Sequence, residues 1–360
     1  MKHPRMIVKC KPNGRVLQMI DENIVFVMGA GANIPYGYPS GRDLKQKIIK
    51  LTQGMTGRTD SKRFSVVGHP LENGARIQLS DVQSFEKALS SSEHASIDAF
   101  LNIYDGNRTF QAIGKFCIAY IIQTTHGRPP KCKTEGGESE DDWMTYLFDK
   151  MVQGSTKSTF ANNNVSFITF NYDTYFDRRL KKCIQCSLNC STEETEAIFR
   201  EFRIIHVYGS LDEIHDDENQ PTLAHRISSE HSKIKTIYEL YQDREDEDHI
   251  LEARKIVHDN TVIMLGCGLH SENLRLLEID DKIKNQGTIY ATAYGITQRE
   301  AQRSIQALGV RKDLRHIRMF FGPESTPLEY NTSTTEGTFN RPNWPVDVGC
   351  TELLRNCPAF

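Results

Sequence analysis

The feature that most constrains this chain is an apolar stretch over residues 24–28 that runs directly into a turn of small residues, Gly29-Ala30-Gly31-Ala32. An unbroken run of large apolar residues predicts a strand buried on both faces, as the strands of parallel sheets are. In α/β folds such a strand brings backbone amides to the edge of the sheet, and small residues let the pyrophosphate of a dinucleotide approach closely. Alone the signal is weak, because glycines also end ordinary strands.

Composition narrows the class of protein. The 360 residues carry a formal net charge of −3, which argues against a general binder of nucleic acids or membrane surfaces. We expect no membrane span and no signal peptide, because no apolar stretch is long enough and the chain opens with polar and charged residues. The 9 cysteines lack a regular spacing and favour reduced thiols, so we expect a cytoplasmic protein.

Expected strands and helices alternate along the chain. After 24–28, apolar β-rich runs predict strands near 165–170, 202–208, 261–268, 287–294 and 317–321. Helical spacing of apolar residues predicts helices near 45–51, 81–104, 110–125, 143–151, 175–180 and 297–308. This order predicts an α/β fold with a Rossmann-like, doubly wound and mainly parallel sheet and an inserted helical module.

The expected domain organisation follows from this order. Residues 1–22 form an N-terminal extension, residues 23–322 a nucleotide-binding domain with a helical insertion at about 81–151, and residues 323–360 an irregular tail. The clearest strands all end in glycine or polar residues, and in a parallel sheet these carboxyl ends share the edge where ligands bind. We therefore expect the site at this edge, with the helical insertion over it.

The strand ends, taken in order, resemble those of the sirtuin (silent information regulator) family. The segments that carry the resemblance are Gly29-Ala30-Gly31-Ala32 with Pro39 and Arg42, then Phe170-Asn171-Tyr172-Asp173, then His206-Val207-Tyr208-Gly209-Ser210, and last Leu265-Gly266-Cys267-Gly268 with Asn273. They are similar to the family's Gly-Ala-Gly turn, its Gln-Asn-Ile-Asp segment, its His-Gly segment and its late glycine turn. The nearest likeness is to bacterial sirtuin-like NAD+ hydrolases of anti-phage defence, which share the Asn-Tyr-Asp segment and a segment like 96–101.

The resemblance implies that the main domain binds NAD+ and hydrolyses it to nicotinamide and ADP-ribose. Asn171 would orient the ribose or a water near the nicotinamide-bearing carbon, and Asp173 would hold the nicotinamide amide or the Asn171 loop, with His206 as base. The alternative for Asn171 and Asp173 is that they only cap the helix that follows. The residues implied to contact NAD+ are Gly29, Ala30, Gly31, Ala32, Pro39, Arg42, Tyr208, Gly209, Gly266, Gly268 and Asn273.

Two features depart from the family pattern. Tyr208 stands directly before glycine, where sirtuins carry the catalytic histidine, and His206 lies two residues earlier. On an extended strand both side chains would point to the same face, so His206 could still reach the site; the alternative is a satisfied core histidine. The second departure concerns zinc, because the cysteines Cys183, Cys186 and Cys190 precede the histidine and no second Cys-x-x-Cys pair follows. We therefore favour a cysteine-rich helix end and expect no metal site.

The strand-end motifs and the missing zinc module favour one function over several alternatives. Without a zinc module, attack by water on NAD+ is favoured over peptide deacylation. The resemblance implies NAD+ depletion during phage infection, with NAD+ as substrate and no other cofactor. It also implies control by homo-oligomerisation, by a separate hexameric translocase-type ATPase or by an Argonaute-like partner, with no membrane and no direct nucleic-acid contact. The alternatives are an NAD+-dependent protein deacylase or ADP-ribosyltransferase, or a non-catalytic nucleotide-binding module if Tyr208 marks loss of the base.

Three further polar residues occur in or beside these segments. Asp98 either lies near the site or is a first-turn acid that stabilises the start of a helix. Glu272 either meets the adenine ribose or caps a helix, and His270 is expected to be structural.

Overall fold

The computed structural model describes much of the chain in detail. The described residues are 19–56, 66–71, 74–94, 96–125, 142–211, 227, 231–236, 239–240, 247–268, 270–279, 289–292, 303, 317–320, 328–331, 338–339 and 349–357. Most of the expected N-terminal extension lies outside them, as does the expected helix over 297–308 apart from Arg303.

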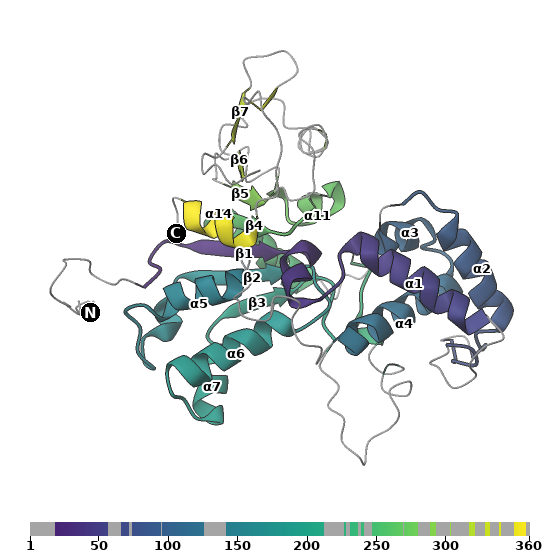
Figure 1. Ribbon diagram of the computed structural model, residues 1–360, viewed down its shortest axis with the longest axis horizontal. Coiled ribbons are helices and arrows are strands. Elements are labelled where there is room, and N and C mark those ends of the chain that lie inside the picture. The colour runs from purple at the N-terminus through teal and green to yellow at the C-terminus, as the bar shows by residue number, and fades with distance from the viewer. Residues whose placement is uncertain are drawn as a thin grey trace, which may run out of the picture.

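A largely parallel sheet forms the centre of the fold (Figure 1). Its strands are β1 (Ile24–Met28), β2 (Val165–Thr169), β3 (Arg203–His206), β4 (Thr261–Leu265), β5 (Ile289–Thr292), β6 (Ile317–Phe320), β7 (Leu328–Asn331) and β8 (Thr338–Phe339). The order is β3-β2-β1-β4-β5-β6-β7-β8, and every pair from β3 to β6 is parallel, whereas β7 and β8 are antiparallel. The order 3-2-1-4-5-6 is that of Rossmann folds, so the predicted fold class is confirmed.

Strand β1 lies at the switch point of the sheet, paired with β2 on one side and β4 on the other. All of its side chains are at most 1% exposed, which explains its unbroken apolar sequence. Phe26 stacks on Phe167 of β2 with ring centroids 5.6 Å apart. In open α/β sheets, ligands bind beyond the carboxyl ends of the strands at such a switch point.

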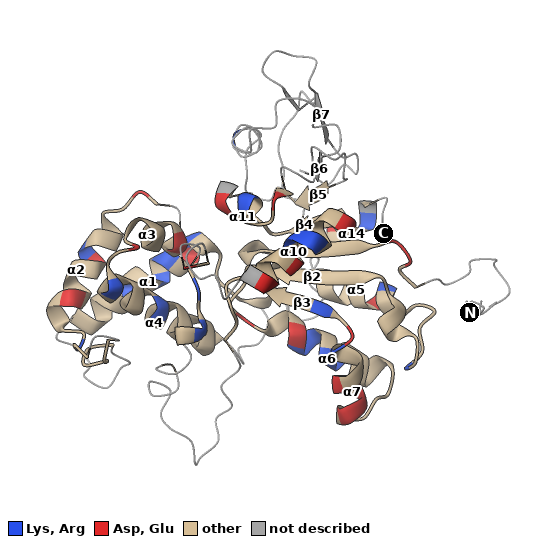
Figure 2. Cartoon of the chain, turned by 180° about the vertical axis from the view of Figure 1, so that it is seen from behind, with Lys and Arg blue, Asp and Glu red and all other residues tan. Residues whose placement is uncertain are grey.

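Helices cover both faces of the sheet. The helices on one face include α5 (Trp143–Val152), α6 (Tyr175–Ser187) and α14 (Cys350–Asn356), which are in front in Figure 1. On the opposite face, seen in Figure 2, lies α10 (Glu247–Asp259). Helix α7 (Thr192–Phe199) packs on α6, and the short α11 (Ser271–Leu276) follows β4. The two faces are therefore buried, as a parallel sheet requires.

A separate group of helices, the helical module, lies beside the sheet (Figure 1). It consists of α1 (Gly41–Thr56), α2 (Leu79–Ser90), α3 (Ile97–Ile103) and α4 (Arg108–Thr125). Its core includes Phe85, Phe100 and Phe110, whose ring centroids are 5.3 to 6.2 Å apart. None of the helices in the described part of the chain is long and apolar enough to cross a membrane.

The expected boundaries of the insertion, about 81–151, need correction at both ends. Helix α1 belongs to the module because its apolar face, including Leu44 and Ile48, is buried against α2 and α4. Helix α5 leaves the module and packs on the sheet, where Trp143 stacks on Phe176 of α6 at 6.2 Å. The indole Nε1 of Trp143 also donates to the carbonyl of Ala32, 2.8 Å away, which ties α5 to the turn after β1.

The expectation of an irregular tail over 323–360 is wrong for part of that segment. Strand β7 pairs with β6, β8 pairs with β7, and α14 packs against α5 and β5. Cys350, Leu353, Leu354 and Cys357 are all buried. Their spacing of three, four and seven residues is that of a helix, a signal that the polar, Pro-rich sequence before it obscured.

Candidate functional site

The turns after β1 and β4 interlock at the carboxyl edge of the sheet. The amide of Gly29 donates to the carbonyl of Leu265 at 2.9 Å, and that of Gly31 donates to the carbonyl of Gly266 at 3.0 Å. A Cβ atom on Gly29 or Gly31 would lie 2.7 Å from the Gly266 oxygen. The small residues are therefore needed for the two turns to pack against each other.

This packing changes the expected role of the small-residue turn. The amides of Gly29 and Gly31 are occupied by the β4 turn, and the amide of Ala32 donates to the carbonyl of Gly29 at 3.0 Å. Among the four amides of this turn, only that of Ala30 lacks an acceptor within the part of the chain that the structure describes. The turn therefore has a structural role, because most of its amides bind the protein's own backbone. Of its four amides, that of Ala30 is the one left for a ligand among the described residues.

The loop after β2 brings Asn171 and Asp173 against the β1 turn. The side-chain amide of Asn171 donates to the carbonyl of Gly29 at 3.2 Å, and the Asn171 backbone amide donates to the Thr169 hydroxyl at 3.0 Å. Nδ2 of Asn33 donates to both carboxylate oxygens of Asp173, at 2.9 and 3.1 Å. Asn171, Asp173 and Asn33 are all buried. The structure therefore joins two of the strand ends that the sequence singled out.

Asp173 is held in an apolar environment by few polar partners. Burial raises the pKa of its carboxyl above the ordinary range, although the Asn33 amide and the Tyr175 backbone N–H, 3.1 Å away, act in the opposite direction. Thr174 is the N-cap of α6 and makes no side-chain cap bond, whereas Asp173 just before it accepts from the first N–H of the helix, so Asp173 supports the helix start as well as contacting the β1 turn. Asn33 was not among the predicted site residues, although it directly follows the small-residue turn.

The Asn33–Asp173 pair should behave as one unit. Replacing Asn33 by aspartate places two carboxylates together in a buried site, and we expect a loss of about 3 kcal/mol in the free energy of unfolding. The exchanged protein, Asn33→Asp with Asp173→Asn, restores one donor facing one acceptor and should recover most of that loss. Urea unfolding of the single and double variants measures this. An exchanged protein no more stable than Asn33→Asp would contradict the pairing.

Strand β3 ends earlier than expected, and this separates His206 from Tyr208. The strand stops at His206, and the Gly209 amide donates back to the His206 carbonyl at 3.2 Å, which forms a turn. The expected two-residue alternation therefore does not reach Tyr208. His206 Nε2 lies 3.2 Å from Oδ2 of Asp177 on α6, whereas the Tyr208 hydroxyl donates to Oδ1 of Asn273 on α11. The expectation that both side chains point to one face of a strand is wrong.

The carboxylates near His206 shift the pKa of its ring. Burial of the ring lowers its pKa, but the hydrogen bond and charge of Asp177, together with the charge of Asp173, outweigh burial and raise the pKa above the ordinary value. The other ring nitrogen, Nδ1, is buried and has no hydrogen-bond partner among the residues that the structure describes. Asp177 was not predicted, although its place one turn into the helix after β2 is where a partner for the edge of β3 would lie.

The remaining predicted residues differ in their surroundings. Pro39 is buried just before α1, and Gly268 lies against the ring of His270. Arg42 is exposed on the first turn of α1 and forms no hydrogen bond or ion pair with the described residues. The structure thus brings the turns after β1 and β4 together with Asn171 and Asp173, and joins Tyr208 to Asn273, but it places Arg42 at the surface.

The three clustered cysteines and one polar hollow lie outside the candidate site. Cys183 and Cys186 are on α6 and Cys190 follows it, all with free thiols. Within the described residues, no group of three or more His, Cys, Asp or Glu side chains could hold a metal ion. One polar hollow, lined in part by Arg203 and Lys255, is at the amino edge of the sheet, opposite the strand ends discussed above.

No protein-family model matches this chain, and no match is found among curated proteins.

Proposed function

We propose that this protein is an NAD+ glycohydrolase, which uses water to cleave NAD+ into nicotinamide and ADP-ribose. The observation that carries the proposal is the placement of buried Asn171 and Asp173 against the turn after β1, at the switch point of a Rossmann-like sheet. The ordered likeness of the strand ends to sirtuins supports NAD+ as the ligand. It extends the proposal to a cytoplasmic, homo-oligomeric effector of anti-phage defence under the control of an ATPase or Argonaute-like partner.

The proposed reaction breaks the bond between the ribose C1′ atom and the nicotinamide nitrogen. The bonding electrons leave with nicotinamide, an oxocarbenium-like ribose forms, and water adds to C1′ and loses a proton. Nδ2 of Asn171 is engaged by Gly29, so its Oδ1 atom, which has no hydrogen-bond partner among the described residues, is the group able to orient the water or a ribose hydroxyl. Asp173 would hold this loop in place, and neutral His206 would accept the proton.

The test is an assay of the purified protein with NAD+, alone and with the product of its neighbouring gene. We expect nicotinamide and free ADP-ribose in equal amounts. Turnover that depends on an acetylated peptide would instead support the deacylase. Binding of NAD+ without cleavage in any assembly state would overturn the proposal in favour of the non-catalytic module.

The pH dependence tests the role of His206. Because Asp177 raises the pKa of His206, the neutral base is lost as the pH falls through a value above about 6.5, and activity should decline there. Asp177→Asn removes that charge, so the acidic limb of the pH–rate profile should move to lower pH, and His206→Ala should abolish the limb. Asp259→Asn is the matched control, because Asp259 lies 3.1 Å from the exposed His258 far from the site. An unchanged profile in Asp177→Asn would exclude His206 as the base.

A further inference from the structure

One side-chain pair joins the helical module directly to the Asn-Tyr-Asp segment of the candidate site. The hydroxyl of Tyr172 donates to Oδ1 of Asp98 at 2.6 Å. Tyr172 stands directly between Asn171 and Asp173, whereas Asp98 is in the first turn of α3, in the helical module. A residue 74 positions away in the sequence therefore holds the centre of the Asn-Tyr-Asp segment.

We propose that Asp98 is a positioning residue for NAD+ cleavage, and that the helical module uses it to fix Tyr172 and thereby the neighbouring Asn171 and Asp173. This inference rests on the proposed function and assigns part of the reacting site to the module. Asp98 acts through Tyr172, and the proposed reaction does not require Asp98 to touch NAD+.

Tyr172 is held from several directions, so its hydroxyl contact can set the position of the loop. Its carbonyl accepts the Leu211 amide at 2.7 Å, and its buried ring lies 6.2 Å from that of Tyr208. Tyr208 in turn donates to Asn273 on α11. Among these contacts the bond to Asp98 is the one that comes from the helical module.

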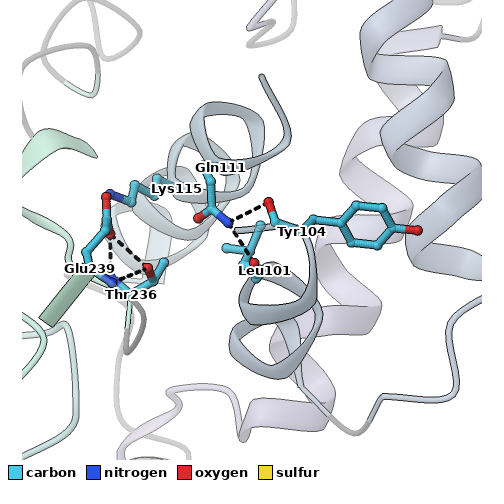
Figure 3. A network of polar contacts seen from close by, with 6 residues as sticks. All are labelled: Leu101, Tyr104, Gln111, Lys115, Thr236 and Glu239. Carbon is cyan, nitrogen blue, oxygen red and sulfur yellow. Dashed lines mark hydrogen bonds and ion pairs between the residues drawn. The ribbon is translucent and has the colours of Figure 1, made fainter. Parts of the chain in front are cut away.

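The helix that carries Asp98 is tied to its neighbour α4 at its carboxyl end, as Figure 3 shows for Gln111. Nε2 of Gln111 on α4 donates to the carbonyls of Leu101 and Tyr104, at 2.6 and 3.1 Å, which ties the end of α3 to α4. Ser96 caps the start of α3 by accepting from the amide of Ala99. Both ends of the helix that carries Asp98 are therefore fixed.

A second bridge joins the same module to the end of β3. Lys115 on α4 forms an ion pair with Glu239, and Glu239 accepts from the amide and hydroxyl of Thr236 at 2.7 and 2.9 Å (Figure 3). Directly before Thr236, the amide of Lys235 donates to the carbonyl of Tyr208 at 3.0 Å. The module thus contacts the site segments after both β2 and β3, which is the geometry expected if it positions them.

The surroundings of Asp98 disfavour the charged form of its carboxyl. Burial raises the pKa of its carboxyl, although the Tyr172 hydroxyl and the nearby His270 act in the opposite direction. Asp98 is half-buried, and a carboxyl with a raised pKa lowers stability at neutral pH; such groups are frequent at functional positions. This agrees with a role beyond packing.

The experiment removes the contact from each side. Tyr172→Phe and Asp98→Ala should each lower kcat about 10- to 100-fold with little change in KM, because a misplaced reacting group slows the chemical step. The double variant should be no slower than the slower single variant. Asp98→Asn keeps an acceptor oxygen for Tyr172 and should retain most of the activity. Tyr104→Phe is the control, since the Tyr104 hydroxyl forms no hydrogen bond among the described residues.

Amide hydrogen exchange supplies a readout that does not need activity. Peptides covering residues 169–175 should exchange faster in Tyr172→Phe and Asp98→Ala, while peptides of β4 stay protected. If Tyr172→Phe shows the exchange rates and the kcat of the wild-type protein, the inference is overturned. This holds even if Asp98→Ala unfolds and exchanges along its whole length. If the wild-type protein does not cleave NAD+, the proposed function fails, and exchange alone still shows whether Asp98 positions the loop.

Discussion

Replacing Asn171 by alanine is expected to slow NAD+ cleavage about 100- to 1000-fold, because a preorganised polar group at a charge-developing centre is worth that much in acyl-transfer enzymes. The substitution removes the side-chain oxygen that would orient water or a ribose hydroxyl. It also removes the 3.2 Å bond from Nδ2 to the carbonyl of Gly29. The measurement is kcat for release of nicotinamide, with KM expected to change little.

The loss of activity must be separated from a loss of stability. One hydrogen bond is worth about 1 kcal/mol, so Asn171→Ala should remain folded. Asn163→Ala is the matched control, because Asn163 is also buried but lies at the amino edge of the sheet, where Nδ2 donates to the carbonyls of Met151 and Phe160 at 3.0 and 2.8 Å. Asn163→Ala should lose more stability and keep its kcat. An Asn171→Ala protein with wild-type kcat would leave Asn171 as a structural residue and remove the main support for the hydrolase.

The fold class could be predicted because it follows from local patterns of apolar, polar and glycine residues. Strands β1 and β4 are buried, so their sequences are unbroken apolar runs. The polar and glycine residues that follow them mark the carboxyl edge, since a parallel sheet places all such ends together. The limits of the helical module were not predictable in this way, because the amphipathic sequences of α1 and α5 each indicate a buried face but not the partner against which that face packs.

The contacts of the site could be predicted only in part. Asn171 and Asp173 could be found because they end a strand, but their partners could not. The Asn33–Asp173 pair joins residues 140 positions apart, and no local pattern states which polar side chains meet at such a distance. The end of β3 is a second example, because the turn after His206 is contacted by a distant segment, in which the Lys235 amide donates to the carbonyl of Tyr208 at 3.0 Å.

Replacing Gly266 by alanine is expected to destabilise the protein by about 3–5 kcal/mol, the sum of backbone strain and steric overlap. Gly266 has a φ of 59°, a left-handed conformation that other residues adopt at a cost. A Cβ atom there would lie 1.9 Å from the backbone nitrogen of Ala32 and 2.4 Å from the carbonyl carbon of Gly31. Both neighbours are backbone atoms of the small-residue turn, so no side-chain rotation can relieve the overlap.

Gly268→Ala gives the matched control two residues further along the same turn. The added Cβ would meet the His270 ring, with Nε2 at 2.6 Å, and this exposed side chain can move away. We expect a change under about 1 kcal/mol in the free energy of unfolding, measured by urea titration of both variants. If Gly266→Ala does not fold, its soluble yield against that of Gly268→Ala makes the same comparison. Equal stability of the two variants would show that the turns after β1 and β4 are not interlocked, and the support for Asn171 through Gly29 would then be lost with them.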